Sequence, residues 1–137
     1  MPPLFNLEVH TPYRPFFIGA VESVILTLVD GEICIYAHHA PFTAPSESCI
    51  LRIKDDQGVV RSAFVTEGIL EVKDHKDVLM VDDAKWPEEI KLERVRIHQQ
   101  EAEENLKSAF LKKEIERAKA KLRRAEVRFK AWEMSQK

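Results

Sequence analysis

The chain has 137 residues, of which 45% are hydrophobic and 32% charged, a composition typical of one globular domain with room for a small appendage. No apolar stretch approaches the roughly 20 residues of a membrane helix, and the N-terminus lacks the basic region and apolar run of a secretory signal. The four glycines lie ten or more residues apart. This spacing excludes a Walker loop and a dinucleotide-binding fingerprint, which both need closely spaced glycines.

The charge distribution and the positions of glycine and proline divide the chain at the same place. Residues 1–84 carry 6 basic and 13 acidic side chains, a net charge of −7, whereas residues 85–137 carry 15 basic and 10 acidic side chains, a net charge of +5. All four glycines lie before residue 69, and the last proline is Pro87. We therefore expect two domains, residues 1–86 and residues 87–137.

The first domain is predicted to consist of β-strands. Short runs rich in β-branched residues alternate with turn-forming segments such as Asp30-Gly31 and residues 55–58. The expected strands are residues 7–9, 21–29, 33–36, 50–53, 59–65, 69–72 and 78–81. No helical crossover fits between these runs, so the pattern favours an antiparallel β-sandwich or flattened barrel.

The second domain is predicted to be helical. Pro87 suits a first helical position, and Glu88 and Glu89 would follow near the positive end of the helix dipole. Apolar residues keep helical spacing through two segments: Leu92, Val95, Ala102, Leu106 and Ala109 in the first, and Leu111, Ile115, Ala118, Leu122, Ala125, Phe129 and Trp132 in the second. A turn at residues 105–108 would give an antiparallel two-helix hairpin, and the alternative is one long helix covered by another surface. The fold class is α+β.

Two rows of cations flank the apolar stripe of the second helical segment. At about 100° per residue, one row falls within a narrow arc: Lys113, Arg117, Lys121, Arg124 and Arg128. The other lies on the far side of the stripe: Lys112, Lys119, Arg123 and Lys130. Such a surface suits an acidic partner, and a solvated helix face is the alternative interpretation.

The sequence offers no assembled catalytic or metal site. Cys34 and Cys49 are too far apart for a zinc knuckle or a CxxC redox motif. His38 and His39 are adjacent, and adjacent residues on a strand point to opposite faces, so no metal site is expected there. Neither a G-x-S-x-G elbow nor an HExxH motif occurs. We therefore do not expect an enzyme.

Four segments carry a family resemblance in chain order. Residues 7–22 run from L-E-V through T-P to F-F-I-G-A-V-E, residues 30–41 read D-G-E-I-C-I-Y-A-H-H-A-P, residues 66–72 read T-E-G-I-L-E-V, and residues 78–84 read V-L-M-V-D-D-A. With the helical hairpin after them, they resemble the ε subunit of the bacterial F-type rotary ATP synthase. The second and third segments resemble the family's E-G-E-x-G-I-x-P-x-H-A-P signature and its G-G-hydrophobic-L-E-V strand.

The resemblance implies a non-catalytic rotor subunit of the central stalk. Such a subunit couples ion-driven rotation of the membrane ring to ATP synthesis, and its C-terminal helices restrain ATP hydrolysis. The implied partners are the γ subunit, the loops of the ring of c subunits and an acidic loop of the catalytic β subunit, and not nucleic acid. The implied location is peripheral, on the cytoplasmic face of the bacterial membrane, without insertion.

The resemblance also implies roles for particular residues. Contact with the c-ring or γ is expected at Asp30, Gly31, Glu32, His38 and His39. Contact with the β subunit is expected from the first cationic row, which consists of Lys113, Arg117, Lys121, Arg124 and Arg128.

Some relatives bind regulatory ATP between the folded helices, through an I/L-D-x-x-R-A segment and later arginines. Here Arg94, Arg124 and Arg128 stand at the matching arginine positions. Lys91 replaces the family aspartate and Val95 its alanine, so no resident cofactor is expected, and regulatory ATP binding is not favoured.

Two cysteines and Ala37 depart from the family pattern. Cys34 and Cys49 stand where the family usually has glycine, and Ala37 where it has proline. A side chain at a glycine position is costly if the backbone there needs a positive φ. Either those turns are rearranged, or the family glycines serve close packing.

The competing interpretation is a stand-alone interaction module whose basic hairpin binds an acidic protein or nucleic acid. Against nucleic acid, the isoelectric point is near 6.2. In addition, Trp86 and Trp132 are not interleaved with the cationic rows as stacking platforms would be.

Overall fold

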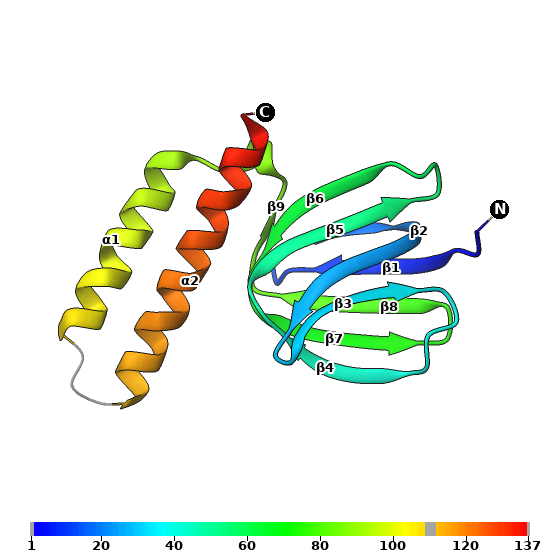
Figure 1. The fold of residues 1–137 in the computed structure, drawn as a ribbon, viewed down its shortest axis with the longest axis horizontal. Coiled ribbons are helices and arrows are strands. Elements are labelled where there is room, and N and C mark those ends of the chain that lie inside the picture. Colours follow the sequence, from blue (N-terminus) through cyan, green and yellow to red (C-terminus); the bar gives the residue numbers. More distant parts are fainter. Residues whose placement is uncertain (1, 109–111, 137) are drawn as a thin grey trace. The chain divides into compact units, whose positions relative to one another are not determined.

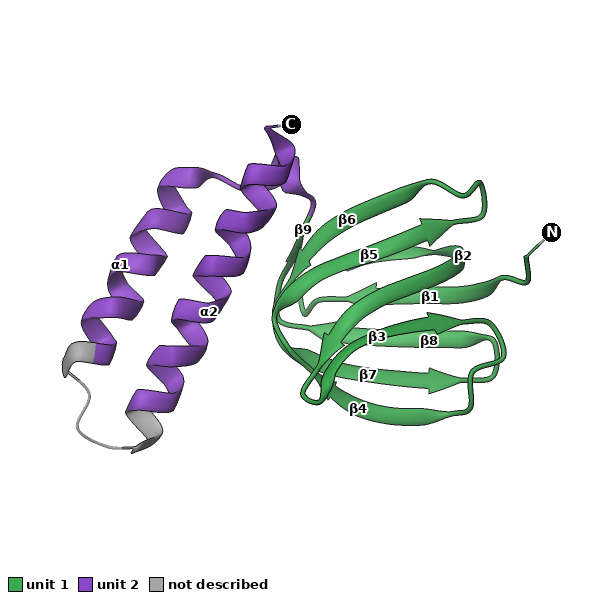
Figure 2. Ribbon diagram, in the orientation of Figure 1, with its two compact units in different colours: residues 1–85 green, residues 86–137 purple. Residues whose placement is uncertain are grey.

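The computed structural model describes residues 2–108 and 112–136 (Figure 1). The chain divides into two compact units, Met1–Lys85 and Trp86–Lys137 (Figure 2). This division falls one residue before the boundary expected from the charge distribution and the positions of glycine and proline. The first unit consists of strands and the second of helices.

The described residues of the first unit form nine strands. They are β1 (Phe5–His10), β2 (Pro15–Leu28), β3 (Gly31–Tyr36), β4 (Phe42–Ser46), β5 (Cys49–Asp55), β6 (Val60–Val65), β7 (Gly68–Lys73), β8 (Lys76–Val81) and β9 (Ala84–Lys85).

The sheet folds back on itself and closes into the expected sandwich. Its strand order is β1-β8-β7-β4-β2-β5-β6-β9, with β3 paired to β2 and an additional pairing of β1 with β2. The long β2 makes this closure possible: its first half pairs with β1 and its second half with β3 and β5, with a register shift between Val21 and Ser23. A bulge at such a shift bends a strand and increases its twist.

Two features of the sheet differ from the sequence prediction. All pairings are antiparallel except that of β1 with β8, which is parallel. Neither β4, which contains Pro45 and lacks a β-branched run, nor the two-residue β9 was predicted from the sequence. Pairing with β7 along its whole length holds β4 in the sheet, so tertiary context outweighs local propensity there.

The interior of the sandwich is filled by alternate side chains of its strands. On β1, for example, Phe5, Leu7 and Val9 are buried while the residues between them face outward. The largest fully buried side chain is Phe64 on β6. Each such side chain contributes about 1.5–3 kcal/mol through burial, which is how strands of five or six residues hold together.

The two cysteines at family glycine positions cause no backbone strain. Within residues 2–108 and 112–136, positive φ values occur at Gly31, Gly58, His38 and His75 only. Cys34 lies in β3 with its side chain exposed, and Cys49 lies buried in β5. Because both have ordinary strand dihedrals, a side chain is accommodated at each position without distortion.

The described residues of the second unit form the short 3₁₀ helix η1 (Pro87–Glu89) and two helices, α1 (Leu92–Ser108) and α2 (Lys112–Ser135). The helices lie side by side and antiparallel (Figure 1), which confirms the predicted hairpin. None of the described helices is long and apolar enough to cross a membrane.

Both ends of the first helix differ from the prediction. The chain is extended at Ile90, with φ −86° and ψ 128°, so Pro87 begins the 3₁₀ turn and not α1. The Trp86 N–H donates to the Glu89 carboxylate at 2.9 Å and stabilises this turn. The expected turn at residues 105–108 is wrong, because α1 continues through Ser108. The link at residues 109–111, which includes Ala109 and Leu111 of the predicted stripes, lies outside the described residues.

Candidate functional site

The turn between β2 and β3 holds the first three residues predicted to contact a partner. Asp30 lies in the turn, and Gly31 and Glu32 begin β3, all three exposed. Gly31 has φ 129°, a conformation that a residue with a side chain adopts only with strain, which explains glycine at this position. The Glu32 carboxylate pairs with Arg52 at 3.0 Å on the surface.

The turn between β3 and β4 holds the other two, and both are exposed. His38 has a left-handed φ of 66°, and its ring meets that of His75, which has φ 57°, edge to face with centroids 5.2 Å apart. The His39 Nδ1–H donates to the Ala40 carbonyl oxygen at 2.9 Å, and its ring lies 5.1 Å from that of Phe42.

The structure does not bring these five predicted residues together. The two turns lie at opposite ends of β3, about 17 Å apart at a strand rise of roughly 3.3 Å per residue (Figure 1). The predicted contact set is therefore two separate surfaces: the Asp30 turn (residues 30–32) and the His turn (residues 38–39).

Asp77 lies on β8 beneath the loops at the His-turn end of the sandwich and was not identified from the sequence. Its side chain is 3% exposed, and its Oδ2 has no hydrogen-bond partner among the described residues. Burial raises the pKa of Asp77 to about 6, against a smaller lowering influence of His39. The period-two pattern of β8 places residue 77 inward, and that pattern is the signal that could have revealed it.

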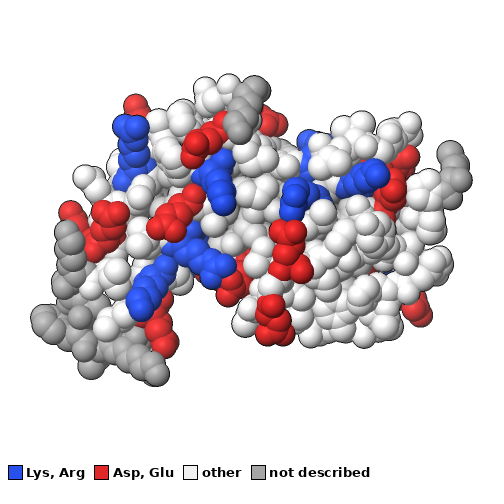
Figure 3. All heavy atoms as spheres, viewed as in Figure 1, with Lys and Arg blue, Asp and Glu red and all other residues white. Residues whose placement is uncertain are grey.

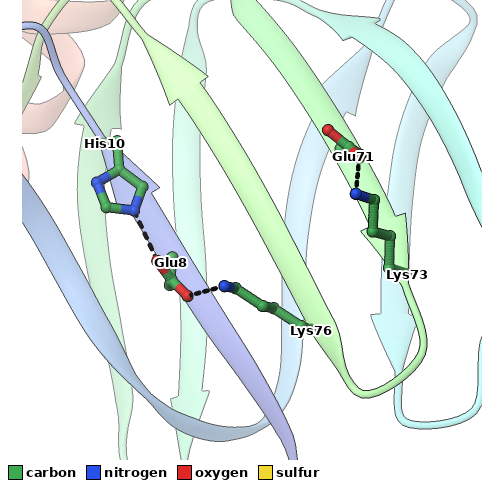
Figure 4. Close-up of polar contacts among 5 residues, drawn as sticks. All are labelled: Glu8, His10, Glu71, Lys73 and Lys76. Carbon is green, nitrogen blue, oxygen red and sulfur yellow. Dashed lines mark hydrogen bonds and ion pairs between the residues drawn. The ribbon is translucent and has the colours of Figure 1, made fainter.

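A cluster of ion pairs covers the outer face of β1, β7 and β8 (Figure 4). The Glu8 carboxylate accepts from Lys76 at 2.9 Å and bonds His10 at 2.8 Å, and Lys73 pairs with Glu71 at 2.7 Å. The hydrogen bond from Lys76, followed by that from His10, lowers the pKa of Glu8. The parallel pairing of β1 with β8 is what places Glu8 and Lys76 within reach of each other.

A hollow of about 680 Å³ lies in the same unit, beside this cluster. Its lining includes Pro12, Pro45, Ile69 and Met80, and the last two are 48% and 45% exposed. Exposed apolar side chains around a concavity are typical of a protein-docking surface. Gly68, also in the lining, is required by close packing: a Cβ there would lie 1.9 Å from the carbonyl oxygen of Met80.

The first cationic row lies on α2, at the spacing of one helix face. Arg117 is exposed, while Lys121, Arg124 and Arg128 are half-buried. The ammonium of Lys121 pairs with Glu101 of α1 at 2.9 Å. The side chain of Lys113 lies outside the described residues. Acidic side chains are interspersed with basic ones over the helices in Figure 3.

His98 on α1 lies among the arginines predicted to bind nucleotide. Burial and then Arg128 lower the pKa of His98; Lys121 and Arg94 act in the same direction, and Glu101 opposes them. The hairpin therefore brings Arg94 and Arg128 into electrostatic reach of one imidazole. His98 and Glu101 were not identified from the sequence, and their helical spacing from Arg94 is the signal that could have revealed them.

No group of three or more His, Cys, Asp or Glu side chains within the described parts of the chain could hold a metal ion. The site geometry is that of contact surfaces: two exposed turns, an apolar hollow and a cationic helix face.

Comparison with known proteins shows the family to which this chain belongs. Residues 4–87 match the family model of the ATP synthase Delta/Epsilon chain, beta-sandwich domain. The chain is 40% identical over 127 residues to the ATP synthase epsilon chain of Caldanaerobacter subterraneus subsp. tengcongensis, covering 92% of this chain and 91% of that protein. It is 42% identical over 126 residues to the ATP synthase epsilon chain of Caldicellulosiruptor bescii, with the same coverage.

Solved structures show the same fold at lower sequence identity. A chain of the Euglena gracilis mitochondrial ATP synthase, from a structure of OSCP, F1 and c-ring, superposes with a TM-score of 0.78 at 18% identity and covers 96% of this chain and 82% of that chain. A chain from the central stalk and c-ring of the Tetrahymena thermophila mitochondrial ATP synthase gives 0.69 at 18% identity, covering 96% and 98%. The protein belongs to the ATP synthase epsilon chain family.

Proposed function

We propose that the chain is a non-catalytic rotor subunit of the central stalk of an F-type ATP synthase. The observation that carries this proposal is the match to ATP synthase epsilon chains at 40–42% identity over 92% of the chain, which includes both units. The alternative of a stand-alone module is not favoured, because the relatives match the sandwich and the hairpin together. Peripheral attachment to the cytoplasmic face of the membrane is part of the proposal.

The two ends of β3 serve different neighbours in this proposal. One of the two surfaces, the Asp30 turn or the His turn, contacts the c-ring loops, and the other contacts the γ subunit. Their separation along β3 supports this division, since a single small loop of a partner does not reach both. The apolar hollow with Ile69 and Met80 adds a surface suited to a protein partner of the rotor.

The cationic row of α2 acts as an electrostatic brake on ATP hydrolysis by facing an acidic loop of the catalytic β subunit. Each exposed pair of opposite charges contributes little, but several aligned and partly desolvated pairs contribute more. The half-buried positions of Lys121, Arg124 and Arg128 support such alignment, because their stems are already held by the helix surface.

Charge reversal tests the brake. In the α/β/γ catalytic assembly from the same source, the triple variant Arg117→Glu, Lys121→Glu, Arg124→Glu is expected to lose most of the inhibition of ATP hydrolysis. The matched control reverses Lys119, Arg123 and Lys130 in the second row, and is expected to keep it. Both variants should still bind the assembly. Equal inhibition by the two variants would rule out the brake, and failure of the unmodified chain to bind would rule out the stalk role.

We further propose that the chain has no resident cofactor and does not use ATP as a regulator. Lys91, exposed at the start of the helical unit, supports this proposal, because it inverts the charge of the family aspartate. Calorimetry of the full chain at millimolar ATP is expected to show no heat of binding. Saturable heat that disappears in Arg94→Ala would contradict this.

A further inference from the structure

Strand β3 forms an open edge of the sandwich. Its six residues, Gly31–Tyr36, pair with β2 on one side (Figure 1), and among the described residues no strand pairs with the other side. Strands β3 and β5 lie on opposite sides of β2, because Val24 is the register partner of both Ile35 and Ile53. The side of β3 that faces away from β2 therefore presents backbone groups to which a further strand can bind.

The register fixes which residues present their backbone groups at this edge. In an antiparallel pair, directly opposite residues alternate between hydrogen-bonded and non-hydrogen-bonded pairs. Leu28 and Gly31 are register partners across a two-residue turn, so they form a hydrogen-bonded pair. The alternation then directs the N–H and C=O groups of Glu32, Cys34 and Tyr36 away from β2 and toward the open edge.

The features that normally protect an edge strand are missing from β3. Natural edge strands are kept very short, or they carry lysine, proline or a bulge. The six residues of β3 include no lysine and no proline, and their pairing with β2 runs without a register shift. At the end of the sheet order, by contrast, β9 has two residues, and β6 carries Arg61 beyond its pairing with β9 at Phe64 and Val65. The edge of β3 is thus long and unprotected.

The charges around β3 indicate the chemistry of a segment that fits this edge. Residues 15–51 include four acidic side chains and no lysine or arginine. Two of the acidic side chains are paired with β5, on the far side of β2: Glu22 with Lys54 at 3.3 Å and Glu32 with Arg52 at 3.0 Å. No cation of β3 or its two flanking turns opposes the exposed Asp30. A basic segment is therefore favoured over an acidic one.

The two faces of β3 indicate the pattern of such a segment. On the inner face Ile35 is buried and Ile33 half-buried, whereas Cys34 and Tyr36 are exposed on the outer face. Directly opposite side chains on paired strands contact each other. A segment that alternates apolar with basic residues therefore suits this edge, because its apolar residues cover Ile33 while the others meet the outer face.

We propose that β3 is a strand-addition site: an extended basic segment of a rotor neighbour pairs through its backbone with Glu32, Cys34 and Tyr36 and lengthens the sheet. This proposal rests on the rotor function only for the source of the segment. The site also connects the two contact surfaces, because the Asp30 turn and the His turn lie at the two ends of β3. A small loop does not reach both, but an extended segment of six residues spans roughly 20 Å and does.

Amide hydrogen exchange of the full chain, read residue by residue, tests the proposal. In the chain alone, the amides of Glu32, Cys34 and Tyr36 should exchange faster than those of Ile33 and Ile35, which bond β2. In complex with the purified γ and c-ring assembly, exchange of the first three should slow by about tenfold or more, and exchange of the other two should change little. Binding without this alternating protection would overturn the proposal, while the rotor function would stand.

Two substitutions at Cys34 separate a backbone contact from a side-chain contact. Cys34→Pro removes the outward N–H, whereas the matched control Cys34→Ala removes the thiol and keeps the N–H. Affinity for the assembly should fall by about tenfold in Cys34→Pro and stay unchanged in Cys34→Ala. Equal affinity of the two variants would overturn the proposal. If Cys34→Pro does not fold, the exchange pattern of the unmodified chain decides.

A peptide probe distinguishes failure of this site from failure of the rotor function. If the unmodified chain does not bind the assembly, the rotor function fails, and a capped six-residue peptide of alternating lysine and valine then decides. Protection of the three outward amides by this peptide, and not by its glutamate counterpart, would support the site, and no protection would overturn it. Protection that rises with the concentration of the chain alone would identify a second copy as the occupant and overturn the proposed basic partner.

Discussion

The ammonium of Lys121 on α2 lies 2.9 Å from the Glu101 carboxylate on α1, which joins the two helices of the hairpin by an ion pair. The hydrogen bond from Lys121 lowers the pKa of Glu101. Lys121 belongs to the row that we propose to face the catalytic subunit. Glu101 therefore partly neutralises, within the hairpin, the Lys121 charge that we propose to face an acidic loop of the partner.

Removing the internal partner of Lys121 should strengthen inhibition. In Glu101→Gln, the ammonium no longer has a carboxylate beside it, so its attraction to an acidic partner increases. We expect about twofold tighter inhibition of ATP hydrolysis, the size of an exposed ion pair. Glu103→Gln changes the net charge of the chain equally without touching this pair, and should leave inhibition unchanged. Equal tightening by both variants would assign the effect to net charge alone.

Gly68 should tolerate no side chain. Its ideal Cβ would lie 1.9 Å from the Met80 carbonyl oxygen, a backbone atom of the paired strand β8. Gly68→Ala is therefore expected to lower the free energy of unfolding by about 3 kcal/mol in urea denaturation.

A second glycine provides the control. Gly58 has φ 79° and open space around it, so Gly58→Ala should cost about 1 kcal/mol through backbone strain alone. Similar losses at the two positions would show that β7 and β8 are not packed as described.

Acidification should destabilise the helical hairpin through His98. Because the folded pKa of His98 is lowered by burial and by Arg128, the unfolded chain binds a proton more readily than the folded chain. Stability contributed by neutral His98 is present above the ordinary histidine pKa of about 6.5 and falls as the pH drops below it. Helix amide exchange measured between pH 5 and 8 should show this loss.

The substitution His98→Gln should flatten this dependence. The protection factors of the helix amides should then not decrease below pH 6.5, while His10→Gln in the sandwich should leave the helix profile unchanged. A hairpin that exchanges equally in the native chain and in His98→Gln at pH 5 would show that His98 has no such influence.

Asp77 should have the opposite effect on the sandwich. Its folded pKa of about 6 lies above the ordinary 3.8, so the folded state holds the proton more tightly and is favoured at low pH. The free energy of unfolding should decline as the pH rises from about 4 to 6, by up to about 3 kcal/mol. Asp77→Asn should abolish the decline and be more stable than the native chain at pH 7, whereas Asp74→Asn should behave like the native chain. A native stability that rises with pH over this interval would contradict the assignment.

The sequence by itself determined the features that depend on local pattern. The change in charge and in glycine and proline content near Trp86 predicted the division of the chain, and short runs rich in β-branched residues predicted seven of the strands. Helical spacing predicted both helices and the cationic face of α2. These properties depend on the residue types within one short stretch of the chain. Residues close together in sequence therefore indicate both the element and the side of it that is buried.

Only the tertiary structure decided the features that depend on pairing between distant segments. The parallel pairing of β1 with β8, the strand β4 around Pro45 and the approach of His38 to His75 all join residues far apart in the chain. The same holds for the separation of the Asp30 turn from the His turn, and for the enclosure of Asp77 between Leu7 and Val72. Strand register and chain closure create these relationships, and no local pattern encodes them.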